Sequence, residues 1–462
     1  MVETVLIYPY FNREGSRSIF RFPPLGLGYI ASYLKEHQVT ADIVDCTFMD
    51  EAKAIDRVRE LNPQIVGVYS MFTMRNASVR FAKNLRDDCD LLVVGGPLPT
   101  TEPELFLEHF DIVAVGEGER TMFEIVKAHR GEMELREVDG IVYKEKAGKI
   151  VKAQAEREGE IIHTRSRDPI PDLNTIPSPD RNLFDNDSYK RYYRQSRGYT
   201  TTSIMTSRGC PFNCDFCSKP VFGDTFRELS AEKIVDEVED ILSLGYDRVF
   251  FNDDCFTLTK RRVHRVCDEM VERGLDFGWE CLSRVDMLDE HVAAKMRKAG
   301  CERIFFGLES GNDSVLKIMN KGAGVHQARR AVESAASAGI STGAFFILGY
   351  PGETNDTILD TIRFATSLPL DYLSFTFPYP IPGTMLYEKV RDKLIEEEPE
   401  PTGRKLVDHK LIYRSDFSEG KLEFAVLKAM SQFHMRKHLG WPSAVVEKPF
   451  EILTDALFKI LK

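Results

Sequence analysis

The sequence lacks the features that mark membrane-spanning and secreted proteins. No apolar run reaches the roughly 18 residues of a membrane-spanning helix, and residues 1–4 (M-V-E-T) lack the basic start of a secretory signal. Only 9 of the 462 residues are cysteines. That number is too small for a disulfide scaffold of this size and fits a reducing compartment. We therefore expect a cytoplasmic protein without a membrane span.

Positively charged residues are fewer than negatively charged ones. The chain has 61 Lys and Arg against 72 Asp and Glu, which gives a formal net charge of −11. A duplex-binding protein needs a basic footprint, so this balance argues against nucleic acid as a partner. Apolar residues make up 43% of the chain and charged residues 29%, which is an ordinary globular composition. At roughly 100–200 residues per domain, the length predicts two to four domains.

Hydrophobic patterning divides the chain into four parts. In residues 1–135, apolar runs alternate with helical stretches, which predicts a doubly wound parallel sheet. Residues 136–198 include a stretch with four prolines (168–187), and we expect an extended connector there. The alternation returns over 199–395, which predicts a full or partial β/α barrel with its active site at the carboxyl ends of the strands. Residues 396–462 are expected to form a helical extension.

The expected strands are short apolar runs, each followed by glycine, proline or small polar residues. In the first part they are residues 2–8, 41–44, 65–69, 91–94 and 112–115. In the barrel they are residues 202–206, 248–252, 276–281, 303–308, 342–348 and 373–377. Helices are expected between the barrel strands at 231–243, 261–273, 290–299, 324–338 and 354–367.

Three of the nine cysteines stand close together after the first expected barrel strand. Cys210, Cys214 and Cys217 have the spacing C-x3-C-x2-C. Three thiolates from one loop can hold a four-iron cluster and leave one iron open to another ligand. A structural zinc site would be closed and four-coordinate, often with paired C-x2-C knuckles, and no second knuckle follows here. The spacing therefore favours an iron–sulfur cluster.

The cysteine triplet and its companions resemble the radical S-adenosylmethionine (SAM) superfamily. Phe216 fills the aromatic position that this family places against the SAM adenine. Glu309, in G-L-E-S-G, matches the acidic position at the end of the fourth strand, and Arg284 falls where members hold a polar SAM contact. The resemblance implies a 4Fe-4S cluster on the three cysteines. It also implies SAM contacts at Phe216, Arg284, Glu309, Gly349, Gly352 and Glu353, the last three in the glycine-rich turn G-Y-P-G-E.

Each SAM candidate also has a structural interpretation when taken singly. Glu309 could cap a helix, and Arg284 could form an ion pair with Asp286. Glycine-rich turns such as 349–353 are common at the ends of barrel strands. The ordered recurrence of these features behind the cysteine triplet favours the cofactor site.

The first part of the chain carries small residues where its expected strands end or its helices begin. They occur in P-P-L-G-L-G (23–28), V-G-G-P (94–97) and V-G-E-G-E-R (115–120). Such positions let a large cofactor or a phosphate approach the backbone, so a nucleotide, a flavin or a corrinoid would fit. The order of the three motifs resembles the cobalamin-binding domain that precedes many radical SAM barrels. This resemblance implies cobalamin contacts at Tyr8, Leu25, Gly26, Ser70, Met71, Gly95, Gly96, Pro97, Gly116, Glu117 and Gly118.

One feature of many corrinoid domains is missing. The motif D-x-H-x-x-G, which supplies a histidine to cobalt, does not occur. We therefore expect a residue other than histidine, or none, below the cobalt. The candidates are Tyr8, Tyr10, Ser70 and Met71.

Together the resemblances imply a cobalamin-dependent radical SAM methyltransferase. The implied fold class is α/β: a Rossmann-like cobalamin-binding domain, a partial (β/α)6 barrel of the TIM type and a helical C-terminal extension. In such enzymes a 5′-deoxyadenosyl radical removes hydrogen from an unactivated carbon, which then receives a methyl group from methylcobalamin. The implied electron donor is a low-potential protein of the flavodoxin or ferredoxin type. Candidates for substrate contact or proton relay are Asp253, Asp254, Tyr350 and Tyr379.

Three alternatives bear on function. A cobalamin-binding radical SAM enzyme that rearranges or cyclises a small molecule without methylation cannot be separated from a methyltransferase by sequence. A methylthiotransferase would carry three further cysteines in its first domain, where only Cys46 and Cys89 occur, so this class is rejected. A non-enzymatic sensor needs no SAM pocket, so the turn 349–353 and Glu309 argue against that class. Our preferred substrate is an amino-acid residue in a protein or peptide, because the layout is similar to that of enzymes that modify methyl-coenzyme M reductase; a small molecule is the alternative.

Overall fold

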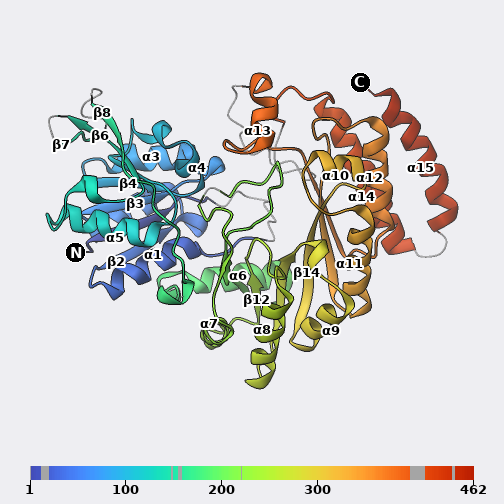
Figure 1. Ribbon diagram of the computed structural model, residues 1–462, viewed down its shortest axis with the longest axis horizontal. Coiled ribbons are helices and arrows are strands. Elements are labelled where there is room, and N and C mark those ends of the chain that lie inside the picture. The colour runs from blue at the N-terminus through green and yellow to red at the C-terminus, as the bar shows by residue number, and fades with distance from the viewer. Residues whose placement is uncertain are drawn as a thin grey trace. The chain divides into compact units, whose positions relative to one another are not determined.

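The computed structural model describes residues 2–11, 20–146, 149–153, 159–219, 221–395, 411–439 and 443–461. The chain divides into two compact units (Figure 1). The first comprises Met1–Cys210 and Lys219–Asp247, and the second comprises Pro211–Ser218 and Arg248–Lys462. Within the described parts, no helix is both long and apolar enough to cross a membrane.

The first unit is built on a sheet of the order β2-β1-β3-β4-β5-β6-β7, with β8 paired to β6. Strands β1 to β5 run parallel, as the apolar runs predicted, and β6 to β8 add an antiparallel edge. The strands are β1 (Thr4–Tyr8), β2 (Ala41–Asp45), β3 (Ile65–Tyr69), β4 (Leu91–Gly95), β5 (Ile112–Ala114), β6 (Ile141–Lys146), β7 (Lys149–Ile150) and β8 (Glu160–His163). The helices between them are α1 (Leu25–Glu36), α2 (Glu51–Leu61), α3 (Arg75–Leu85), α4 (Pro97–Thr101) and α5 (Gly118–His129).

Both faces of this sheet are buried. Alternate strand residues point to opposite faces, so each strand contributes to two cores. In β1, Leu6 joins a core cluster that also contains residues of α1 and α5. Its neighbours Val5 and Ile7 join a second cluster, with residues of α2 and α3. Helices thus cover both faces, which confirms the predicted doubly wound arrangement.

The connector and the start of the barrel also belong to the first unit. They contain α6 (Asn186–Arg197), β9 (Thr201–Ile204) and α7 (Ala231–Ser243). The sequence pattern predicted β9 and α7 but not α6. That helix begins at the cap Asp185, whose side chain accepts the N–H of Ser188, and ends at Gly198 with a positive φ of 81°.

The second unit repeats a strand-then-helix pattern. Its strands run parallel in the order β16-β15-β14-β13-β12, so each lies beside its neighbour in sequence. They are β12 (Arg248–Phe251), β13 (Gly278–Ser283), β14 (Cys301–Glu309), β15 (Ser341–Ile347) and β16 (Tyr372–Thr376). The helices are α8 (Lys260–Glu272), α9 (Glu290–Lys298), α10 (Asp313–Ile318), α11 (Val325–Ser337) and α12 (Asn355–Ser367). With β9, these strands account for the six that the sequence predicted.

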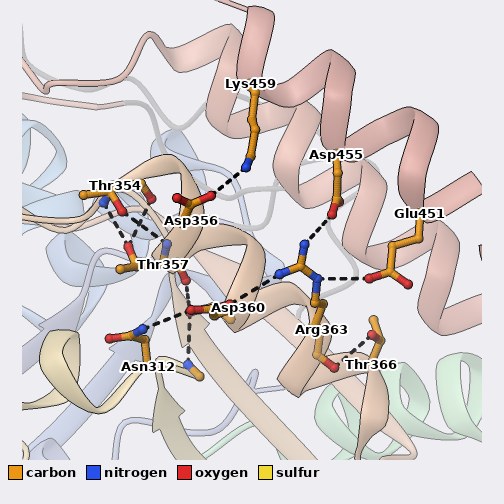
Figure 2. A network of polar contacts seen from close by, with 12 residues as sticks. Asn312, Thr354, Asp356, Thr357, Asp360, Arg363, Thr366, Glu451, Asp455 and Lys459 are labelled. Atoms are coloured by element: carbon orange, nitrogen blue, oxygen red, sulfur yellow. Dashed lines mark hydrogen bonds and ion pairs between the residues drawn. The ribbon is translucent and has the colours of Figure 1, made fainter.

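The C-terminal part is largely helical, as predicted, and its described residues 411–418 form no helix. Helix α13 (Met385–Val390) precedes α14 (Glu419–Leu439) and α15 (Ser443–Ile460), and expected extension residues 396–410 lie outside the described chain. Figure 2 shows that α15 is fastened to α12 by charged groups: Arg363 pairs with Glu451 and Asp455, and Lys459 pairs with Asp356.

Candidate functional site

The three clustered cysteines lie in one loop between β10 (Ser207–Arg208) and β11 (Arg227–Glu228), which pair antiparallel. Cys210 and Cys214 are partly exposed, Cys217 is exposed, and none of the three is in a disulfide. Accessible thiols in one loop are the donor set of an iron–sulfur cluster. Within the described residues, no three His, Cys, Asp or Glu side chains are gathered into a ready-made metal site.

Arg284 follows β13 directly and approaches one of the cysteines. Its Nη1 is 3.7 Å from Sγ of Cys214, and its guanidinium lies 3.6 Å from the ring centroid of Phe212. Its Nε and Nη2 donate to the two carboxylate oxygens of Asp286 at 3.0 and 3.1 Å. The ion pair with Asp286 and the approach to a cysteine thus occur together. Asp286 therefore orients the Arg284 guanidinium beside the Cys214 thiol.

Glu309 ends β14 in a left-handed conformation with φ 64°, which is uncommon for a residue other than glycine. The pairing of β14 with β15 shifts register between Gly307 and Glu309. The Glu309 carboxylate is buried and accepts a hydrogen bond from Nζ of Lys321 at 2.9 Å. It does not cap the next helix, because Asn312 caps α10 with its own side chain. The strained backbone therefore presents Glu309 to Lys321.

Lys321 was not predicted from the sequence, yet it joins the predicted SAM residues. It is buried, and its Nζ lies 5.8 Å from the ring centroid of Phe216. Burial acts to lower the pKa of Lys321, but the charges of Glu309 and Cys214 outweigh this and raise it. The lysine is therefore charged. The second unit thus brings together Phe216, Arg284, Glu309 and Lys321 around Cys214.

The turn after β15 is organised by its own glutamate. Gly349 and Gly352 have positive φ values of 86° and 95°, and an added Cβ on Gly349 would lie 2.5 Å from Cδ1 of Leu422. Oε2 of Glu353 accepts the backbone N–H groups of Gly349 and Tyr350 at 2.7 and 2.9 Å. Burial raises the pKa of the Glu353 carboxyl to about 7. Glu353 therefore shapes this turn.

The four candidates for substrate contact differ in accessibility. Asp253 is buried and accepts a hydrogen bond from Nη2 of Arg262 at 3.0 Å. Tyr350 is buried, Tyr379 is half-buried and Asp254 is exposed. Burial raises the pKa of both tyrosines, so neither is a ready base at neutral pH. Among the four, Asp254 is the accessible carboxylate.

The predicted corrinoid contacts lie at the carboxyl edge of the first sheet. Tyr8 ends β1 and Ser70 follows β3, and between these strands the chain connections reverse direction along the sheet. Open α/β sheets bind ligands at such a switch point. Oγ of Ser70 is buried without a hydrogen-bond partner among the described residues, and a Cβ added to Gly26 or Gly116 would meet nothing within 4 Å. An orphaned hydroxyl and open glycines at this edge fit a large polar cofactor.

Other predicted corrinoid residues serve the packing of the first unit. Leu25 is in the core, and a Cβ on Gly118 would lie 2.7 Å from Cδ1 of Ile30 in α1. A Cβ on Gly96 would lie 2.6 Å from the carbonyl oxygen of Ser70. Glu117 is buried in an ion-pair cluster with arginines, so its carboxylate is already engaged. The remaining predicted contacts Met71, Gly95 and Pro97 lie at the ends of β3 and β4 and the start of α4.

Two family models match the chain. Residues 204–365 match the radical SAM superfamily, and residues 18–126 match the B12 binding domain. An uncharacterized methyltransferase of Pyrococcus horikoshii is 35% identical over 382 residues, which cover 79% of this chain and 78% of that protein. The anaerobic magnesium-protoporphyrin IX monomethyl ester cyclase of Rubrivivax gelatinosus is 30% identical over 410 residues, which cover 85% of this chain and 71% of the cyclase.

Solved structures share the fold. The cobalamin-dependent SAM radical enzyme OxsB with aqua-cobalamin bound has a TM-score of 0.75 at 19% identity and covers 99% of this chain and 72% of its own. The radical SAM methyltransferase TsrM from Kitasatospora setae, with cobalamin and an iron–sulfur cluster bound, has a TM-score of 0.68 at 20% identity. It covers 85% of this chain and 75% of its own. Together with the family models, these likenesses confirm the predicted fold class, including the partial barrel.

Proposed function

The chain belongs to the family of cobalamin-dependent radical SAM methyltransferases, and we propose that it transfers a methyl group to an unactivated carbon of its substrate. The proposal rests on one observation: a chain 35% identical to a methyltransferase carries both an accessible three-cysteine loop and an open corrinoid-type sheet edge. When bound, cluster and SAM supply a 5′-deoxyadenosyl radical, and cobalamin supplies the methyl group. The protein positions both cofactors and excludes water.

The residues around Cys214 suit the SAM site. Cys210, Cys214 and Cys217 would hold the cluster. Arg284 and Lys321 place positive charge near Cys214, which would attract the carboxylate of SAM. The buried Glu309 carboxylate would attract the amino group of SAM. Asp254 is the accessible candidate for substrate contact.

Cofactor content and label transfer test this function. Protein purified without oxygen should contain iron, sulfide and a corrinoid. SAM with a deuterated methyl group, a reductant and the substrate should give a product that carries the label, with two SAM consumed per turnover. Cys214→Ala should abolish transfer, and Cys267→Ala, which alters a buried cysteine of the second unit, should not. The proposal fails if the wild-type protein binds no corrinoid.

A second function is supported by the cyclase of Rubrivivax gelatinosus, at 30% identity. A cyclase-type enzyme would use the same cofactors to rearrange or cyclise a small molecule without methylating it. The deuterium label separates the two functions, because a cyclisation product would contain none. If one SAM is consumed and the product carries no label, the cyclase-type function replaces the methyltransferase proposal.

The substrate and the electron donor are further parts of the proposal. The layout's similarity to enzymes that modify methyl-coenzyme M reductase supports a protein or peptide residue, and the cyclase relative supports a tetrapyrrole. Peptides and tetrapyrroles should be tested side by side, with products read by mass. We propose a flavodoxin or ferredoxin as the donor and the cytoplasm as the location, in keeping with the low cysteine content.

A further inference from the structure

The loop that carries the three cysteines is closed at its base by two buried arginines. Strands β10 and β11, which we call the neck of the cysteine loop, pair so that Arg208 lies directly opposite Arg227. Both side chains are at most 5% exposed. Like charges directly opposite each other destabilise a strand pair, and burial makes unpaired charge more costly still. The neck therefore depends on negative charge from elsewhere in the unit.

Two glutamates of the V-G-E-G-E-R motif supply that charge. Oε1 of Glu117 lies 2.7 Å from Nη1 of Arg227 and 3.4 Å from Nη1 of Arg208. Oε1 of Glu119 lies 2.5 Å from Nη2 of Arg208. The glutamate side chains are at most 4% exposed. Two carboxylates thus neutralise two guanidinium groups out of contact with water, all within the first unit.

Other polar groups of this cluster form hydrogen bonds or ring contacts as well. Oε2 of Glu117 accepts the backbone N–H of Ile170 at 2.7 Å, and Arg227 donates to the carbonyl oxygens of Ile170 and Phe222 at 2.9 and 3.0 Å. The guanidinium of Arg208 lies 5.1 Å from the ring centroids of Tyr29 and Phe222. Both oxygens of Glu117 are therefore used inside the protein. Binding a corrinoid through this carboxylate would break contacts that the neck requires.

We propose that Glu117 and Glu119 are positioning residues for the cluster-bearing loop and not ligands of cobalamin. Their ion pairs keep strands β10 and β11 paired. The backbone position of Cys210, two residues beyond Arg208, is fixed as a result. This inference rests on the proposed function only in assigning the cluster to the three cysteines.

The test compares Glu119→Gln and Arg208→Met with a matched control. The control is Arg181→Met, which breaks another buried pair of the first unit, Arg181 with Glu237 at 2.5 Å. Each protein is reconstituted without oxygen, and three quantities are measured: iron loss to a chelator, the paramagnetic resonance spectrum of the reduced cluster with SAM, and corrinoid affinity. Arg208→Lys, which keeps the charge, serves as the conservative variant if Arg208→Met does not fold.

We expect iron loss from Glu119→Gln to be about tenfold faster than from the wild type, as is usual when a group that supports metal ligands is removed. Its resonance spectrum should change, its corrinoid affinity should not, and Arg208→Lys should recover part of the iron retention. Loss of corrinoid affinity with normal iron retention would overturn the proposal, and so would equal iron loss from Arg181→Met. Failure of the proposed function is distinguishable, because then the wild-type protein itself would bind no corrinoid.

Discussion

Glu353 is a single buried carboxyl group that makes the turn after β15 sensitive to pH. Its Oε2 accepts two backbone N–H groups, while its Oε1 is buried without a hydrogen-bond partner among the described residues. Burial raises the pKa of this carboxyl from 4.5 to about 7. The folded protein therefore holds the proton more tightly than the unfolded chain does. Its free energy of unfolding must fall as the pH rises through this interval.

We expect Glu353→Gln to remove this pH dependence, because glutamine has no titrating proton. In the wild type, the shift corresponds to a loss on the order of 3 kcal/mol between the two pKa values. Urea unfolding at a series of pH values measures the difference. Glu333→Gln, at a half-exposed carboxylate of α11, is the control and should keep the wild-type profile. An E353Q profile as steep as the wild type's would assign the dependence to another group.

Lys321 and Glu309 form a buried ion pair whose partners depend on each other. We expect Lys321→Met to lower the free energy of unfolding by about 3–5 kcal/mol, because it leaves the Glu309 carboxylate buried and unpaired. The double variant Glu309→Gln/Lys321→Met should recover part of the loss. Urea unfolding of the single and the double variant measures the two free energies of unfolding. Arg329→Ala, which breaks the exposed pair with Glu333, should change stability by about 1 kcal/mol or less, and a similar value for Lys321→Met would refute the argument.

Sequence motifs predicted individual residues only where a motif carries them. The SAM resemblance selected Phe216, Arg284 and Glu309, which lie near Cys214 in the second unit; their contact with SAM stays a prediction. Lys321 was missed because its pairing with Glu309 depends on a strained β14 end and a short helix, which no periodicity encodes. The resemblance gave Glu117 as a cobalamin contact. Its burial against arginines far along the chain could not be predicted from the local sequence.

Helix α15 shows at the scale of an element how ion pairs add to apolar packing. Its inward side carries Asp455, which pairs with Arg363 at 2.5 Å (Figure 2). Asp455 also pairs with the fully buried Lys428 of α14 at 2.9 Å. Its outward side exposes large apolar residues, with Leu453 61% and Ile460 78% exposed. The same helix also buries Phe458 completely. Ion pairs and an apolar side chain therefore both hold α15.

We expect the ion pair on the inward side of α15 to matter more for stability than the exposed apolar residues on its outward side. Lys428→Met leaves Asp455 without one of its partners and should lower the free energy of unfolding by about 1–3 kcal/mol. Leu453→Gln, on the exposed face, should change it by no more than about 0.5 kcal/mol. Thermal unfolding of the two variants compares them directly. If Leu453→Gln were the more destabilising, α15 would be held by its apolar face.

Prediction was most accurate for elements with strong periodicity. The expected 231–243 and 354–367 correspond to α7 (Ala231–Ser243) and α12 (Asn355–Ser367). Helix α6 was missed although its ends carry the usual signals, Asp185 as the cap and Gly198 after the last turn. The four prolines of residues 168–187 led to the expectation of an extended connector over the whole of 136–198. Proline restricts only its own φ and the residue before it, so the interpretation reached too far.

For the whole molecule, motif order predicted the sequence of domains, but long-range charge pairs could not be predicted. Arg181 pairs with Glu237, and Arg227 with Glu117, so the compact first unit takes in β9, the neck and α7 as well as the first sheet. Such pairs join residues more than fifty positions apart in the chain. Hydrophobic patterns describe which face of an element is buried, not which distant charge meets it.

Corrinoid binding should be visible in the stability of the whole protein. A ligand that binds only the folded state at a concentration of 100 times its Kd adds about 2.7 kcal/mol to the free energy of unfolding. Gly26 lies at the open edge of the first sheet, near the start of α1, and an added Cβ would meet no atom within 4 Å. Gly26→Leu should therefore leave the cofactor-free protein as stable as the wild type, or more so, since glycine is a poor helix residue.

The same substitution should remove the stabilisation by cobalamin, because the leucine side chain would occupy the space at that edge. Gly420→Leu is the matched control: Gly420 is also the second residue of a helix, α14, and also has nothing within 4 Å of an added Cβ. Thermal unfolding of both variants with and without hydroxocobalamin measures the effect. If Gly26→Leu were stabilised by cobalamin as much as Gly420→Leu, the corrinoid would have to bind away from α1, and the assignment of this edge would be wrong.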